Sequence, residues 1–300
     1  MKKSFALLFV FGLFFIRTVY PRGQSQTSNT PPRANSTQSS IDDAFFEMER
    51  ALMENEAETT PQDEYLLGRA VAANILAIYK PYSAKPEMTN YVNLICQAIV
   101  INSPNPEIFN GYHVLILDSP EFNAFASPGG HIFITKGLVG LTSSEDMLAA
   151  VIAHELAHIM LKHSVNTINT MKFIDEMAAI ANRASGFAGR DSSAQRLLVF
   201  RDSVGTMMDT IFINGYSQEQ ELEADQEAII LLAASGYNPM AILDVLKALQ
   251  NTENSQSGGW NATHPSARER IANVGIWIGS RQVRDNSSFR ALRFRSIMSN

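Results

Sequence analysis

The sequence has almost no cysteine. Among its 300 residues Cys96 stands alone, which excludes a disulfide framework and any metal site built from several thiolates. Cys96 lies at helical spacing from Val92 and Ile99, a pattern typical of a buried apolar helix face. We therefore interpret Cys96 as a small buried side chain rather than a nucleophile.

The chain also lacks a long hydrophobic run and an excess of positive charge. No apolar stretch reaches the roughly 18 residues that span a bilayer, which excludes a polytopic membrane protein. The 24 Lys and Arg residues are outnumbered by 30 Asp and Glu, and the net charge of −6 argues against a nucleic-acid partner. A hydrophobic fraction of 45% with 18% charged residues is typical of a globular core.

The first 23 residues have the features of a targeting segment. Lys2 and Lys3 precede an apolar stretch from Phe5 to Ile16, which makes about 18 Å of helix and is too short to cross a membrane. Residues 1–23 are therefore predicted to be a signal peptide or an uncleaved N-terminal anchor. We expect an exported protein, periplasmic or envelope-associated in a bacterium, with membrane tethering as an alternative.

Composition divides the rest of the chain into a tether, one domain and a tail. Residues 24–42 are rich in Ser, Thr, Asn, Gln and Pro, and they are predicted to be disordered. Residues 43–280 form the folded domain, in which 165–214 is a helical insertion that either completes the core or acts as a lid. Residues 281–300 are a basic amphipathic tail, which docks on the domain as a helix, remains solvated, or contacts a membrane surface.

Hydrophobic periodicity predicts that the domain is mainly helical. Helices are expected at about 43–58, 62–79, 87–101, 165–185, 192–214 and 217–234, with two more between Pro239 and Ile278. A capping-box pattern from Thr142 to Glu145 opens another helix, which is expected to extend through His163.

Short apolar runs predict a small sheet beside these helices. Residues 114–117 read as a buried strand, and Pro128-Gly129-Gly130 is expected to join 122–127 and 131–135 as a hairpin. The fold class is therefore predicted to be α+β, mostly helical with a small sheet next to the helix that begins after Thr142.

That helix contains the sequence His154-Glu155-Leu-Ala-His158. Residues four apart in a helix lie about 40° from each other around its axis, so both imidazoles leave one face a turn apart. This spacing suits two ligands of a tetrahedral zinc ion, with Glu155 beside them to act on a water molecule. Buried polar residues are costly without partners, and these three interrupt an otherwise apolar helix.

A catalytic zinc ion needs a third protein ligand and one open position. Leu161 and Ser164 stand where the metzincin pattern requires Gly and His, so that class is excluded. His163 lies about 140° around the helix from His158 and is interpreted as a cation at the helix end rather than a ligand. The better candidate is Glu221.

Glu221 belongs to an acidic helical segment in which the other acids have separate roles. Asp225 follows on the same helix face and is placed to orient a ligating histidine, while Glu223 points away as a solvated side chain. The small Ala224 permits close approach to the zinc helix. If His264 supplied a fourth ligand, the site would be closed and structural, and the protein would be a zinc-containing chaperone or binding module. Glu155 argues against that alternative, since a closed site does not need it.

Three motifs occur in a fixed order, and together they resemble the HtpX, BepA and CAAX-prenyl-protease type of zinc metallopeptidase, a gluzincin family. They are His154-Glu-Leu-Ala-His158, Glu221-Leu-Glu-Ala-Asp225 and Thr263-His264-Pro265, and Asn123-Ala-Phe-Ala-Ser-Pro-Gly-Gly-His-Ile-Phe-Ile-Thr135 is similar to the edge-strand region of the family. The likeness covers most of residues 65–278 and points to a soluble, exported BepA-like branch. The chain lacks the multi-span part of prenyl proteases and the room for the helical repeats of BepA-like proteins.

The resemblance implies a zincin-type protease domain and a role for each residue of the site. It implies one Zn²⁺ per chain held by His154, His158 and Glu221, with Glu155 as general base and acid and with Asp225 and Arg270 behind the ligands. It gives His264 two alternative roles, a removable fourth ligand that keeps the enzyme latent or a donor to the oxyanion.

The same resemblance implies how substrates bind. Residues Asn123, Ala124, Phe125 and Ala126 would form the edge strand along which an extended peptide pairs. Such pairing reads the substrate backbone more than its side chains. We therefore expect an endopeptidase that cleaves unfolded or misassembled proteins of the cell envelope as part of protein quality control.

Overall fold

The computed structural model describes residues 61–108, 110–166, 204–205, 208, 215–252, 260–264, 267–278 and 287–298. The predicted N-terminal segment, the tether, the helix at 43–58 and nearly all of the 165–214 insertion lie outside these residues. No helix within the described ranges is long and apolar enough to cross a membrane.

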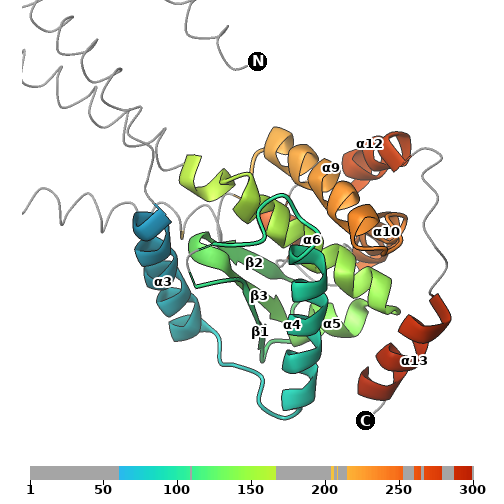
Figure 1. Ribbon diagram of the computed structural model, residues 1–300, viewed down its shortest axis with the longest axis horizontal. Coiled ribbons are helices and arrows are strands. Elements are labelled where there is room, and N and C mark those ends of the chain that lie inside the picture. The colour runs from blue at the N-terminus through green and yellow to red at the C-terminus, as the bar shows by residue number, and fades with distance from the viewer. Residues whose placement is uncertain are drawn as a thin grey trace, which may run out of the picture. The chain divides into compact units, whose positions relative to one another are not determined.

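A three-stranded sheet forms the scaffold of the domain (Figure 1). Its strands are β1 (His113–Leu117), β3 (His131–Thr135) and β2 (Ala124–Ser127), in that order across the sheet. β1 runs parallel to β3, and β2 runs antiparallel to β3. The predicted strand and the predicted hairpin are both confirmed.

Two glycines fix the turn of the hairpin. The turn is the 3-10 segment η2 (Pro128–Gly130), in which Gly129 and Gly130 have φ angles of 73° and 89°. A Cβ atom on Gly130 would lie 2.4 Å from the carbonyl oxygen of Gly111. Only glycine satisfies both the positive φ and this close approach, so the sequence determines where β2 ends and β3 begins.

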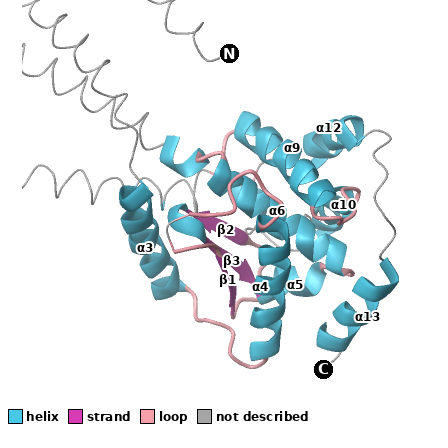
Figure 2. Ribbon diagram, in the orientation of Figure 1, coloured by secondary structure: helices cyan, strands magenta, loops and turns pink. Residues whose placement is uncertain are grey.

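Helices cover both faces of the sheet (Figure 2). α3 (Pro61–Ile78) packs on one face, where it meets Phe125 and Phe133. α4 (Pro86–Val100) and α6 (Glu145–Met160) pack with Ile132 and Ile134 of β3 in the main core. Successive strand residues point to opposite faces, and both faces are buried. This explains why the strands read as unbroken apolar runs.

α6 carries the His-Glu-His motif, and every residue from Met147 to His158 is buried. Its N-cap is Ser144, whose side chain accepts a hydrogen bond from the Met147 N–H. The prediction that Thr142 caps this helix is wrong, because Thr142 instead ends a short unpredicted helix, α5 (Lys136–Leu141), and bonds the Val139 carbonyl.

α6 also ends earlier than predicted. Its last residue is Met160, and Lys162 adopts a left-handed conformation with φ of 55°. A new helical segment starts at His163, so His163 does not continue the helical repeat of α6. Because the chain changes direction at Lys162, the side chain of His163 does not lie where a continuous helix would put it.

The remaining helices wrap around α6. α9 (Gln218–Ala234) begins with a capping box between Ser217 and Gln220 and packs along α6, with Ala224 fully buried in between. α10 (Ala241–Thr252), the short α11 (Trp260–Thr263) and α12 (Ala267–Ile278) follow. The predicted α+β fold, mostly helical with a small sheet, is confirmed. The hydrophobic periodicity of the sequence did not indicate the short helices α5 and α11.

The basic tail contains a docked helix, α13 (Ser287–Met298), which packs on α4 and α6. Arg293 donates hydrogen bonds to both carboxylate oxygens of Glu145 at 2.6 and 3.1 Å, and Glu145 is 1% exposed. Arg290 bonds Asp146 at 3.0 Å and the Gly236 carbonyl at 3.2 Å. Of the alternatives for the tail, the structure shows the docked helix for residues 287–298.

The α13 contact generates a stability prediction. Arg293→Ala should lower the free energy of unfolding by about 1–3 kcal/mol, because a buried carboxylate loses a charged donor. Arg295→Ala is the matched control, since among the described residues Arg295 bonds only the Ala291 carbonyl of its own helix, at 3.2 Å, and it should change stability by less than about 0.5 kcal/mol. Denaturant titration of the full chain measures both. Equal losses in the two variants would contradict the assignment.

Candidate metal centre

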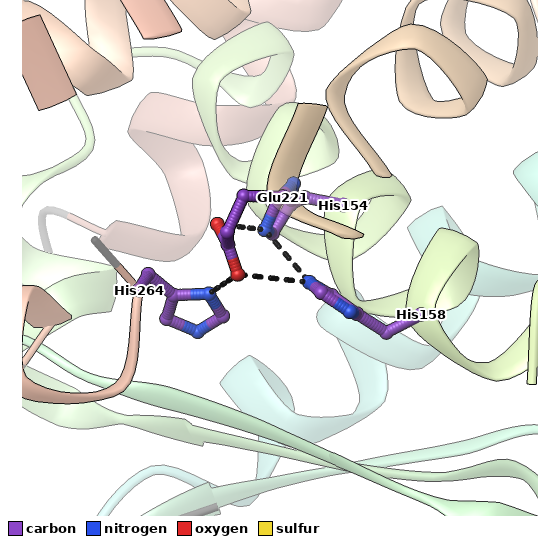
Figure 3. Close-up of side chains that lie close together, drawn as sticks. All are labelled: His154, His158, Glu221 and His264. Carbon is purple, nitrogen blue, oxygen red and sulfur yellow. Dashed lines mark hydrogen bonds and ion pairs between the residues drawn. The ribbon is translucent and has the colours of Figure 1, made fainter. Parts of the chain in front are cut away.

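Four buried side chains converge where α6, α9 and the turn after α11 meet (Figure 3). His154 and His158 come from α6, Glu221 from α9, and His264 follows α11. One nitrogen or oxygen atom from each lies within 4.8 Å of those of the other three. The structure thus brings together all the residues that the sequence analysis singled out as ligands.

The spacing of these atoms fits a zinc ion. The Nε2 atoms of His154 and His158 lie 3.1 Å apart, and they lie 3.5 and 3.4 Å from the nearer Glu221 oxygens. Ligands at about 2.0–2.1 Å in a tetrahedron would be separated by about 3.4 Å. Imidazole nitrogens and a carboxylate oxygen are also the donors that zinc prefers.

Glu155 lies beside the cluster without joining it. Its side chain is fully buried, and neither of its carboxylate oxygens has a hydrogen-bond partner among the described residues. His264 Nε2 lies 3.7 Å from Glu155 Oε1. Burial raises the pKa of Glu155. A buried carboxylate with free lone pairs next to a metal cluster is placed to accept a proton.

Arg270 of α12 supports the ligands from behind. Its Nη2 and Nε atoms bond the two oxygens of Asp225 at 2.6 and 2.8 Å, and its Nη1 atom lies 2.7 Å from Glu221 Oε2. Asp225 Oδ1 in turn lies 3.2 Å from His154 Nδ1. The two acids at positions four apart on α9 therefore face the site together, as the helical spacing predicted.

These contacts set the charge of the ligands. Burial alone would raise the pKa of Glu221, but His264 and Arg270 hold it well below its usual range. Burial and Arg270 oppose protonation of His154, but its hydrogen bonds with Asp225 and Glu221 outweigh them and raise its pKa to about 9. Burial keeps the pKa of His158 well below its usual range. The site thus offers an ionised carboxylate and a neutral imidazole to a cation.

Two aromatic rings that the sequence analysis missed form walls of the site. Tyr216 stacks on His158 with ring centroids 3.9 Å apart, and its hydroxyl lies 2.6 Å from Ser164 Oγ. Trp260 stacks on His264 at 4.0 Å. Trp260 precedes His264 by four residues, a spacing that could have indicated contact; nothing in the sequence pairs Tyr216 with His158.

His163 departs from its predicted role. It was expected to be a cation at the helix end, but it is 2% exposed and lies with its Nδ1 atom 2.9 Å from His158 Nδ1. Its Nε2 atom lies 3.2 Å from Glu223 Oε2, so Glu223 also does more than face solvent. The early end of α6 at Met160 explains the error, because the prediction assumed an uninterrupted helix.

The turn that carries His264 is bonded to the start of β2. The Trp260 N–H donates to the Phe122 carbonyl at 2.7 Å, and the Thr263 hydroxyl donates to Asn123 Oδ1 at 3.1 Å. Asn123 Oδ1 also accepts the N–H of Ala124 at 2.9 Å. Hydrogen bonds therefore link the predicted substrate strand to the turn that carries His264.

Comparison with known proteins agrees with this geometry. Residues 88–278 match peptidase family M48. The mitochondrial metalloendopeptidase OMA1 of Schizosaccharomyces pombe is 27% identical over 202 residues, which cover 67% of this chain and 56% of that protein. The β-barrel assembly-enhancing protease of Escherichia coli K12 is 25% identical over 197 residues, covering 65% and 39%.

A third relative, the metalloprotease LoiP of Escherichia coli K12, is 26% identical over 154 residues, which cover 51% of this chain and 58% of that protein. The matched region thus spans between 39% and 58% of these three relatives. The family match extends over more than half of the chain and includes every residue of the metal centre. The chain therefore belongs to peptidase family M48, whose members are zinc metallopeptidases.

Proposed function

We propose that the protein is a zinc-dependent endopeptidase that cleaves unfolded or misassembled proteins. The observation that carries this proposal is Glu155, a fully buried carboxylate with no hydrogen-bond partner among the described residues, next to a cluster of metal-ligating side chains. A site that only stabilised the fold would gain nothing from such a group, since an unpartnered buried carboxylate is costly.

The residues divide the reaction between them. His154, His158 and Glu221 would hold the ion, and a zinc ion bound there acidifies water and polarises the carbonyl of the scissile peptide. Glu155 accepts the proton of the attacking water and then passes it to the leaving amine. Asp225 and Arg270 keep His154 and Glu221 in place while this happens.

The edge of β2 is the proposed substrate-binding strand. The Thr135 N–H donates to the Asn123 carbonyl at 3.0 Å, so the alternation of an antiparallel ladder would turn the backbone groups of Ala124 and Ala126 away from β3. In this structure the Ala124 N–H bonds Asn123 Oδ1, a contact that a bound peptide would replace. An extended peptide that paired with these groups would be read through its backbone, which suits unfolded substrates. Ala124 and Ala126 are 1% and 2% exposed, so a bound peptide would contact their backbone rather than their side chains.

A second candidate function is supported by one observation. All four potential ligands already lie together, which is what a closed structural zinc site in a chaperone or binding module would require. In the proposed enzyme the same arrangement is a latent state, in which His264 fills the position that the reaction needs open. The variants of Glu155 and His264 below distinguish the two functions.

The proposed location is the cell envelope, reached through the N-terminal segment at 1–23 and its lysines. One relative is named for β-barrel assembly and another for the mitochondrion. Quality control of envelope proteins fits the former and the predicted export. Recovery of the chain from the cytoplasm after cell fractionation would contradict this proposal.

Glu155→Gln tests the proton transfer. Glutamine keeps the size of the side chain but cannot accept the proton, so cleavage of an unfolded casein-type substrate should fall by at least about 100-fold while zinc content is retained. Glu219→Gln, which changes an exposed acid of α9, is the matched control and should cleave at the parental rate. A Glu155→Gln protein that retained most of its activity would rule out the general-base role.

His264→Ala tests the latent state. His264 Nδ1 lies 2.8 Å from Glu221 Oε1 and its ring stacks on Trp260, contacts that support the proposed role of His264 as a fourth ligand. Its removal should leave zinc bound and raise basal proteolysis, whereas His113→Ala, a change to an exposed histidine of β1, should leave the rate unchanged. A fall of about 10²–10³-fold would show instead that His264 donates to the oxyanion. An unchanged rate would exclude both roles.

A further inference from the structure

His163 holds a position that the proposed ligand set does not use. The left-handed backbone at Lys162 turns the chain back at the end of α6, so that the imidazole of His163 meets that of His158 edge to face, with centroids 4.9 Å apart. The side chain of His163 is buried, and it is not among the four residues that converge on the metal centre. It contacts the site through His158.

The contact between the two histidines is a hydrogen bond between like atoms. Their Nδ1 atoms lie 2.9 Å apart, so one of the two must carry the hydrogen and the other must offer its lone pair. His158 Nε2 faces the cluster, 3.1 Å from His154 Nε2 and 3.4 Å from Glu221. If Nε2 of a neutral His158 binds the ion, the hydrogen of that ring must be on Nδ1.

This placement of the hydrogen on His158 determines the direction of the next two hydrogen bonds. The Nδ1–H of His158 donates to Nδ1 of His163, and the hydrogen of His163 must therefore be on Nε2. That atom lies 3.2 Å from Glu223 Oε2, which accepts it. His158 and His163 each have one donor nitrogen and one acceptor nitrogen in the required order, and the Glu223 carboxylate is the final acceptor.

His154 is supported in a different way. Its Nδ1 atom lies 3.2 Å from a carboxylate oxygen of Asp225, and Asp225 is buried and bonded by Arg270. The support of His158 ends in Glu223, whose side chain is 52% exposed. Tyr216 covers the face of the His158 ring, which fixes its plane but does not select which nitrogen carries the hydrogen.

We propose that His163 is a positioning residue for zinc binding, which holds His158 with its hydrogen on Nδ1 and its lone pair on Nε2 and is itself oriented by Glu223. The proposal rests on the proposed ligand set, because it acts through His158. Outer partners of this kind typically change metal affinity by about 10–100-fold when they are removed.

The first test is zinc affinity, measured by competition between the full-length protein and a chelator of known affinity. His163→Leu removes the acceptor and should weaken zinc binding by about 10–100-fold. His163→Asn places an amide oxygen near the position of Nδ1 and should restore most of that loss. Glu223→Gln still accepts the hydrogen without the charge, so its loss should be smaller than that of His163→Leu, and Glu219→Gln is the control.

The outcomes separate this inference from the ligand assignment. If the parental protein binds no zinc, the ligand set itself is wrong. If it binds zinc and His163→Leu binds equally tightly, or if His163→Asn is as weak as His163→Leu, the positioning role is overturned.

A second measurement does not depend on any variant folding. Nitrogen-15 spectra of histidines in the zinc-loaded parental protein should show the hydrogen on Nδ1 of His158 and on Nε2 of His163. The opposite placement on His163 would also overturn the proposal.

Discussion

The metal centre depends on one buried guanidinium. Arg270 bridges Asp225 and Glu221, and through Asp225 it reaches His154, so α12, α9 and α6 are joined at this point. Three carboxylates, Glu155, Glu221 and Asp225, are buried here. Arg270 balances only one of their charges. Burying unbalanced charge is strongly unfavourable, and the remaining deficit equals the charge of a divalent cation. The same arrangement that orders the helices therefore favours a bound cation over the alternative of protons on the histidines or on Glu155, whose pKa burial raises.

The ligands could be predicted from sequence because they lie within regular helices. Spacing of four residues places His154 with His158 and Glu221 with Asp225, and α6 and α9 are continuous over these positions. His163 could not be placed in the same way. α6 stops three residues before it, and the turn uses a left-handed lysine, for which the sequence gives no glycine signal.

Other parts of the site arise from packing alone. Tyr216 reaches His158 because the start of α9 docks beside α6, and nothing in the sequence pairs these two residues, whereas the spacing of Trp260 and His264 could have indicated their contact. The position of the C-terminal tail could not be predicted from the sequence either. Its arginines suit either a membrane surface or a protein surface, and only the tertiary structure pairs Arg290 and Arg293 with Asp146 and Glu145. The hairpin, in contrast, was fixed locally by its glycines.

Zinc K-edge X-ray absorption on the purified full-length protein tests the central claim most directly. The account predicts about one zinc ion per chain, surrounded by imidazole nitrogens and carboxylate oxygen at about 2.0–2.2 Å and with no sulfur, and a Glu221→Ala protein should lose most of that zinc. Absence of zinc from the parental protein, or an unchanged nitrogen and oxygen shell in Glu221→Ala, would contradict it.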